Sequence, residues 1–172
     1  WQDPLCEAFM EGAMSLGIPR NPDYNGAIQE GVSYCQRTIE NGLRMSAAKA
    51  FLHPARKRGN VDVRTHAHVT NIIFEGKRAV GVRYLRGGKG GTPVEVRASK
   101  EVILSGGAYN SPQVLQLSGV GSPELLQSLG IEVRHALPGV GEGLQDHYAP
   151  RSVARVKNIR TINELRRGVS LW

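Results

Sequence analysis

Two glycines ahead of a helix-like segment form the part of this chain that could contact a ligand. The stretch Ser105–Gly121 reads SGGAYNSPQVLQLSGVG and follows EVIL, an apolar run typical of a buried strand. Glycines let the backbone turn sharply or approach another molecule closely, because they carry no Cβ. A helix N-terminus offers free N–H groups and a positive partial charge, which suits a phosphate. The stretch is therefore consistent with a nucleotide or dinucleotide site, and equally with a tight structural turn.

Histidine and cysteine spacings indicate no metal site. Of the five histidines, His66 and His68 alternate along one strand face and could form the edge of a metal site, but no third ligand accompanies them. We therefore predict no metal and a solvated strand there. Cys6 and Cys35 lack metal or redox spacing, so we expect reduced structural thiols. Reduced thiols favour a cytoplasmic location as the default.

Composition and charge limit the classes of partner. The chain has 172 residues, of which 40% are hydrophobic and 22% charged, and this is ordinary for a globular domain. No apolar run approaches the roughly 20 residues that a membrane span needs. The net charge of +7 would suit a polyanion, but the basic stretch Arg56–Arg58 lacks interleaved aromatic residues and a recognition-helix motif. We predict a solvated basic surface and no nucleic acid as partner, with a nucleic-acid-associated domain as the alternative.

Hydrophobic periodicity predicts a mixed α/β or α+β body around this stretch. Asp3 and Pro4 are expected to open a helix that Gly17 ends, and Ser46 to cap a short helix whose end Pro54 disturbs. The residues expected to face inward on the first helix are Leu5, Ala8, Phe9, Gly12, Ala13 and Leu16.

The middle of the chain alternates apolar and polar residues, as strands do. We expect a strand from residue 61 to 74, a hairpin partner at 79–86 and a third strand at 93–99. Residues 101–107, EVILSGG, should form a fourth strand, and its EVIL run is apolar as in a strand covered on both faces. Two further alternating segments, expected to be strands, are residues 131–137 and 151–158.

Two short helices are expected where Ser-Pro pairs occur. Asn110 or Ser111 would cap the first, with Pro112 at its first position. Ser122 would cap the second, which Gly130 would end. Both helices would then lie directly after tight turns.

Taken as a whole, residues 107–121 resemble the second signature of the glucose–methanol–choline (GMC) family of flavin oxidoreductases. That signature runs glycine, a small residue, two variable residues, Ser-Pro, apolar pairs and Ser-Gly-apolar-Gly, and every fixed position matches GAYNSPQVLQLSGVG. The flanking segments FLHPARKRGNVDVRTHAHVTNIIFEGKRAVGVRYLR and LPGVGEGLQDHYAPR are similar to the family's central region and following loop. The resemblance covers nearly the whole chain and points to choline dehydrogenase-like members.

The resemblance implies FAD as cofactor and an alcohol as substrate. Members of the family pass a hydride from the alcohol carbon to flavin N5 while a base takes the hydroxyl proton. The implied architecture is part of a Rossmann-like FAD-binding domain at residues 61–138. Parts of an antiparallel-sheet substrate domain would flank it at residues 1–60, which include the linking segment, and at 139–172. The electron acceptor, and with it the choice between oxidase and dehydrogenase, stays open.

Cofactor-binding positions can be carried over by resemblance alone. Val69 matches the position whose backbone meets the adenine of FAD, and it would equally serve as a plain core valine. Ser105, Gly106, Gly107 and Ala108 match the strand end near the nucleotide half of the cofactor. No residue of this chain is assigned a catalytic role, because the family's G-x-G-x-x-G loop and catalytic histidine have no counterpart among these residues.

Two departures from the family pattern bear on the substrate. Gly143 stands where the family usually has Asn, which removes a polar contact. Choline-oxidising members carry a Glu two residues after the position of His147, and this chain has Ala149 there. A carboxylate suits a quaternary ammonium, so its replacement makes choline doubtful and favours a primary alcohol, a polyol or a polyether alcohol. His147 itself would lie near the active site or order its loop.

We expect the chain to be an internal fragment of a longer enzyme and to be inactive in isolation. The alternative is a non-catalytic remnant or binding module that keeps only the fold.

Overall fold

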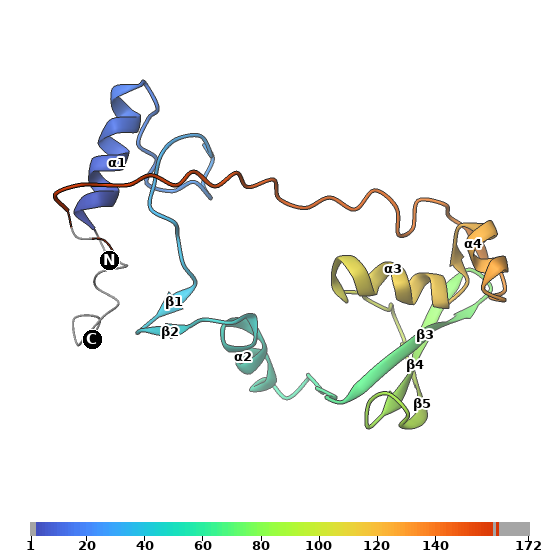
Figure 1. Cartoon of the computed structure of the whole chain (residues 1–172). Coiled ribbons are helices and arrows are strands. Elements are labelled where there is room, and N and C mark those ends of the chain that lie inside the picture. Colours follow the sequence, from blue (N-terminus) through green and yellow to red (C-terminus); the bar gives the residue numbers. More distant parts are fainter. Residues whose placement is uncertain (1–2, 160, 162–172) are drawn as a thin grey trace. The chain divides into compact units, whose positions relative to one another are not determined.

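The computed structural model describes residues 3–159 and 161, which fall into two compact units. One unit runs from Val61 to Ala149, and the other combines residues up to Asn60 with residues from Pro150 onward. Figure 1 shows the helices and strands of each unit in sequence colours. The mixture of helices with antiparallel sheets confirms the predicted fold class. None of the described helices has the length and apolar character to cross a membrane.

Helix α1 (Pro4–Ser15) opens the first unit as predicted. The side chain of Asp3 accepts a hydrogen bond of 2.9 Å from the N–H of Leu5, so it caps the helix that Pro4 begins. The predicted inner face is wrong in detail, since Met10 is the buried residue and Phe9 is 73% exposed. Side-chain contacts of this helix region reach the segment after it, where Glu7 pairs with Arg20 and the N–H of Asp3 donates to the hydroxyl of Tyr34.

The loop after α1 folds back on itself in an ordered way. Asn21 is buried, and its Nδ2 donates to the carbonyl oxygens of Ile28 (2.7 Å) and Glu30 (3.1 Å). An isolated parallel bridge joins Arg20 to Val32. This loop is therefore a packed lobe of the first unit.

A small hairpin and a short helical segment follow. Strands β1 (Ile39–Glu40) and β2 (Leu43–Arg44) flank an Asn41–Gly42 turn with positive φ at both positions, and the periodicity did not predict them. A π-helix η1 (Ala48–Leu52) then continues directly into α2 (His53–Arg56). Pro54 does not end the helical segment, which runs on to Arg56, but the change from π-helix to α-helix falls directly before it.

The second unit is built on a three-stranded antiparallel sheet in the order β3-β4-β5. Its strands are β3 (Ala67–Glu75), β4 (Arg78–Arg86) and β5 (Thr92–Arg97), so the predicted hairpin and third strand are confirmed. The predicted start at residue 61 is wrong. The β3–β4 ladder begins at Ala67 opposite Arg86. Just beyond it, at the end of the hairpin away from its turn, the N–H groups of Gly87 and Gly88 donate to the carbonyl of His66.

Helices α3 (Gly107–Leu117) and α4 (Pro123–Ser128) complete this unit with a short parallel pair, β6 (Val120–Gly121) and β7 (His135–Ala136). The cap that Ser122 provides for α4 was predicted and is confirmed. Helix α3 begins earlier than expected, and α3 lies against β3 (Figure 1). The core residues of the unit are Ile72, Val80, Tyr84, Val114, Val120 and Leu126.

Three predicted strands are wrong in whole or in large part. Residues 101–105 and 151–158 have no ladder partner, and residues 131–137 contain only the two-residue β7. Ile103 is 77% exposed, so the EVIL run is not covered on both faces. An alternating or apolar sequence becomes a strand only where a neighbouring strand completes its hydrogen bonds.

Candidate cofactor site

The turn at Ser105–Ala108 leads into α3, and all four of its residues are exposed. The N–H of Gly106 donates to Ser111 Oγ at 2.9 Å, and Asn110 Nδ2 donates to the carbonyl of Gly106 at 3.1 Å. Gly107 has a φ of +85°, which only glycine adopts without strain, and a Cβ placed there would meet nothing within 4 Å. The side chains of Asn110 and Ser111 therefore stabilise the turn, and the residues of the turn remain exposed to solvent.

The N-terminus of α3 carries no side-chain cap. In contrast, Asp3 caps α1 and Ser122 caps α4 by accepting from backbone N–H groups of the first turn. The first N–H groups of an 11-residue helix have no partner within the helix and carry a positive partial charge. With no acidic residue in the first turn of α3, this end fits an anionic group such as a cofactor phosphate.

Pro112 lies inside α3, contrary to the expectation that it opens the helix. Because proline has no N–H, the carbonyl of Ala108, four residues earlier, lacks its usual helical donor. Ala108 therefore offers an acceptor beside the donors of the helix N-terminus. The sequence prediction placed the helix start too late because it took Ser-Pro as a cap, whereas the glycines had already turned the chain.

Val69 lies on β3, the edge strand of the described sheet, and is 37% exposed. The carbonyl of His66 accepts from Gly87 and Gly88, so it faces β4. Backbone groups of successive residues in an antiparallel strand point to opposite edges. That alternation directs the N–H and C=O of Val69 to the free edge of β3.

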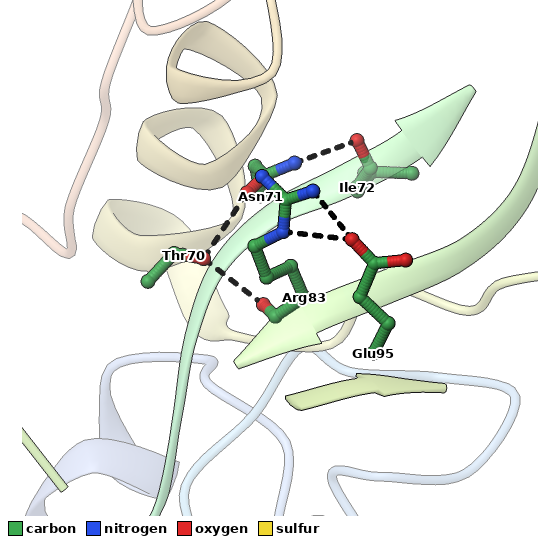
Figure 2. A network of polar contacts seen from close by, with 5 residues as sticks. All are labelled: Thr70, Asn71, Ile72, Arg83 and Glu95. Atoms are coloured by element: carbon green, nitrogen blue, oxygen red, sulfur yellow. Dashed lines mark hydrogen bonds and ion pairs between the residues drawn. The ribbon is translucent and has the colours of Figure 1, made fainter. Parts of the chain in front are cut away.

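A β-bulge follows Val69. The pairing passes from Val69–Tyr84 to Asn71–Arg83, which leaves Thr70 without a partner of its own. The Thr70 hydroxyl donates to Asn71 Oδ1 at 3.1 Å and to the carbonyl of Arg83 at 3.2 Å, and both contacts are marked in Figure 2. Bulges of this kind change the direction of a strand and are frequent beside functional sites.

An ion pair joins the two other strands of the sheet beside the bulge. The guanidinium of Arg83 on β4 pairs with the carboxylate of Glu95 on β5, and Asn71 Nδ2 donates to the carbonyl of Ile72 at 3.2 Å (Figure 2). Arg83 thus contacts both neighbouring strands, because its carbonyl accepts from Thr70 on β3 and its guanidinium pairs with Glu95 on β5. Sequence reasoning missed these contacts, because they join residues far apart in the sequence.

Tyr84, paired with Val69 in the ladder, is buried and bound to an arginine. Arg64 Nη1 lies 3.3 Å from Tyr84 Oη, and Arg64 Nε pairs with Asp62 at 2.9 Å. The hydrogen bond from Arg64 lowers the pKa of Tyr84, with Arg86 acting in the same direction and burial opposing. The segment that precedes β3 does not form a strand, but the side chain of Arg64 connects it to the sheet by a hydrogen bond.

A cleft of about 300 Å³ lies between α3 and the loop at residues 139–144. Gln116 Nε2 donates to the carbonyl of Val140 at 3.1 Å and holds this loop on the helix. Ala108 and Tyr109 line the helix side of the cleft, which therefore begins at the candidate cofactor turn. Gly143, the residue in place of the family's Asn, lies in the same loop and is exposed.

The histidines take no part in a metal cluster. Among residues 3–159 and 161, no group of three or more His, Cys, Asp or Glu side chains could hold a metal ion. His147 is exposed, and its backbone N–H donates to Oδ1 of the preceding residue, Asp146, at 2.7 Å. Ala149 is also exposed.

All five residues predicted for the cofactor lie in the Val61–Ala149 unit. Val69 is on the edge strand β3, and Ser105 to Ala108 begin the helix that packs on that strand. Both places present backbone groups and leave them accessible. The two predicted places differ chemically, since one is an edge strand and the other is a helix N-terminus.

A family model described as GMC oxidoreductase matches residues 2–149 of this chain. Oxygen-dependent choline dehydrogenases of Staphylococcus xylosus and Staphylococcus saprophyticus are 50% and 51% identical to it over 145 residues. These alignments cover 84% of this chain and 25% of each relative, so the chain spans about a quarter of their length.

Two solved structures are also similar to this chain. Pyridoxine 4-oxidase from Mesorbium loti superposes with a TM-score of 0.65 at 30% identity, covering 78% of this chain and 26% of that chain. An FAD-dependent oxidoreductase from Chaetomium thermophilum superposes with a TM-score of 0.54 at 40% identity, covering 56% of this chain and 16% of that chain. The architecture described above is thus shared with flavoenzymes.

Proposed function

Because this chain belongs to the GMC oxidoreductase family and its cofactor is FAD, we propose that it forms part of an enzyme that oxidises an alcohol CH–OH group. When bound, FAD accepts the hydride that leaves the alcohol carbon. The observation that carries this proposal is the uncapped N-terminus of α3 behind an exposed glycine turn, within the region that matches the family.

The residues of the chain would bind and orient the nucleotide half of the cofactor. The first-turn N–H groups of α3 and the open face of Ser105–Gly107 suit a phosphate or ribose. An adenine edge carries an amino donor beside a ring acceptor, so the N–H and C=O of Val69 at the free edge of β3 can pair with both. Backbone recognition of this kind leaves the Val69 side chain free to pack.

The domain assignment is part of the proposal. Residues 61–138 would belong to the FAD-binding domain, and residues 1–60 and 139–172 to the substrate domain and its linking segment. The compact unit from Val61 to Ala149 supports the first boundary and groups residues 139–149 with the sheet. Cys6 and Cys35 are both free thiols, and we keep a cytoplasmic location as a prediction from that cysteine usage.

We propose a neutral alcohol as the substrate, either a primary alcohol, a polyol or a polyether alcohol. The two Staphylococcus relatives are named as choline dehydrogenases, so this proposal gives the chain a different substrate from theirs. Its basis is Ala149, which puts a methyl group where choline-oxidising members of the family have a carboxylate. The carboxylate of Asp146, three residues earlier, accepts a hydrogen bond from the N–H of His147.

The test uses the full-length enzyme that contains this segment. The flavin is released by heat and identified, and alcohol-dependent dye reduction is measured with choline, neutral primary alcohols, polyols and polyether alcohols. We expect FAD, and a kcat/KM at least tenfold higher for a neutral alcohol than for choline. A preference for choline would overturn the substrate proposal. Bound FAD without oxidation of any alcohol would favour the non-catalytic remnant, and failure to bind FAD would overturn the cofactor site.

A further inference from the structure

The β1–β2 hairpin turns at Asn41–Gly42, a pair whose side-chain amide and following backbone nitrogen can react with each other. Both residues are exposed, and both have positive φ, 49° at Asn41 and 73° at Gly42. Within the described part of the chain, neither the side-chain amide of Asn41 nor the N–H of Gly42 has a hydrogen-bond partner. A Cβ placed on Gly42 would meet nothing within 4 Å, so the space around the turn is open.

The reaction open to such a pair is a cyclisation within the chain, and it needs no oxidant or reductant. The backbone nitrogen of Gly42 loses its proton and attacks Cγ of Asn41, the bond from Cγ to Nδ2 breaks, and the amide nitrogen leaves as ammonia. Water then opens the succinimide ring at either carbonyl, which gives an aspartyl or an isoaspartyl link. Glycine favours the attack because it has no Cβ to obstruct the nitrogen, and asparagine is accordingly a thermolabile residue.

Cyclisation requires the peptide between Asn41 and Gly42 to rotate, and few contacts oppose this rotation. Each strand of the hairpin has two residues, all of them are exposed, and no third strand joins the pair among the residues that the structure describes. An isolated two-stranded hairpin is at best marginally stable in water. The positive φ of Asn41 also costs free energy that is released when the turn opens. Local opening of this hairpin should therefore be frequent.

The other Asn-Gly pair of the sequence, Asn25–Gly26, lies in the packed loop after α1 and is restrained at both reacting groups. The N–H of Gly26, which would be the nucleophile, donates to the carbonyl of Asp23 at 3.0 Å. Asn25 Nδ2 donates to Gln36 Oε1, and the backbone N–H of Asn25 donates to Asp23 Oδ1 at 3.1 Å. A Cβ on Gly26 would lie 3.1 Å from the carbonyl oxygen of Asp23, so this turn is also crowded.

We propose that Asn41 is a site of spontaneous deamidation in the folded protein, and that the fold protects Asn25 from the same reaction. The product carries a new carboxylate next to Glu40. In the isoaspartyl form it also carries one extra backbone carbon, so the pairing of Glu40 with Leu43 beside the turn is lost. The inference goes beyond the proposed function and is independent of it, because it uses no contact to a cofactor or a substrate.

The experiment incubates the full-length enzyme that contains this segment at mildly alkaline pH and follows both Asn-Gly pairs by peptide mapping with mass spectrometry. Isoaspartyl links are measured separately, by enzymatic transfer of a methyl group from S-adenosylmethionine to their free carboxylate. We expect Asn41 to react about tenfold faster than Asn25 in the folded enzyme. In enzyme unfolded by urea the two rates should agree within about twofold, because both residues precede a glycine and neither is then restrained.

Two variants test the assignment further. Asn41→Gln keeps the amide but would have to close a larger ring, so the isoaspartyl signal of the folded enzyme should fall to the level of the protected pair. Gln36→Ala removes the partner of Asn25 Nδ2, so reaction at Asn25 should rise severalfold while reaction at Asn41 stays unchanged.

The comparison of the two pairs within the wild type decides the proposal even if a variant fails to fold. Equal rates at the two pairs in the folded enzyme, or a faster reaction at Asn25, would overturn it. So would a folded enzyme in which Asn41 does not react although the unfolded enzyme does, because the hairpin would then be held closed. An unchanged isoaspartyl signal in N41Q would place the reaction at another residue and overturn the assignment as well.

Discussion

Ser111 and Ser122 each precede a proline but act differently in the structure. Ser122 accepts from the N–H of Leu125 and caps α4, whereas Ser111 lies inside α3 and accepts from the N–H of Gly106. The difference arises before the pair, because the glycine turn has already started α3 by that point. A Ser-Pro pair therefore indicates a helix N-terminus only where no earlier turn has begun one.

Position 149 offers a direct test of substrate choice at the scale of one residue. We expect Ala149→Glu to raise kcat/KM for choline about five- to tenfold in the full-length enzyme, since a carboxylate attracts a quaternary ammonium. Ala149→Gln has nearly the same size without the charge and is the matched control. Steady-state dye reduction measures both, and an equal rise in the two variants would show that size and not charge matters.

The ion pair between Glu7 and Arg20 predicts a pH dependence of stability. The hydrogen bond from Arg20, aided by Tyr34, lowers the pKa of Glu7 below its ordinary 4.5. A lowered pKa in the folded state stabilises the fold above the unfolded pKa, and this contribution disappears as the pH falls through the folded value. We expect the unfolding temperature to fall below about pH 4.5, with Arg20→Gln losing this part of the dependence.

Thermal unfolding between pH 3 and 7 measures the effect, with Arg44→Gln as a control at an exposed arginine of β2. The curves of the wild type and R20Q should converge at acid pH and separate above pH 4.5. A constant difference across this range would mean that Arg20 acts through packing and not through the charge of Glu7.

At the scale of elements, the sequence predicted features that depend on residues close together in the chain. It mostly missed features that depend on pairing between distant segments. The caps of α1 and α4 and the β3–β4 hairpin follow from residues close together in sequence. The EVIL run failed because no described strand pairs with it, and the β1–β2 hairpin was missed despite the Asn41–Gly42 turn signal. Likewise the site's glycine turn was found, whereas a hydrogen bond from the N–H of Ile72 to the hydroxyl of Ser118 spans 46 residues and leaves no local pattern.

The glycine turn of α3 can be tested against a glycine inside α1. Both Gly107 and Gly12 have open space around a Cβ, but Gly107 alone has a positive φ, +85°. We expect Gly107→Ala to destabilise by about 1–2 kcal/mol, and Gly12→Ala to stabilise α1 by about 1 kcal/mol. Thermal unfolding of the two variants should therefore shift in opposite directions, and a loss of stability in both would contradict the turn geometry.

At the scale of the whole molecule, the described chain leaves several apolar groups uncovered. Ile103 on the unpaired EVIL run and Tyr109 at the start of α3 are mostly exposed, and so are Leu129 and Tyr148. Relatives are about four times as long, since this chain covers 25% of them. An extended apolar run with free backbone groups is the type of surface that another segment can cover by pairing.

As an isolated chain, residues 1–172 should bind flavin weakly and turn over no alcohol. We expect α3 and the edge of β3 to offer donors for one end of FAD, and we assign no described residue as the base of the reaction. Uncovered apolar groups should also make the purified chain bind a hydrophobic dye and associate. Dye reduction with FAD and a range of alcohols, together with light scattering, measures both. Alcohol-dependent turnover would show that a base lies among these residues, with His147 the first to replace by Ala.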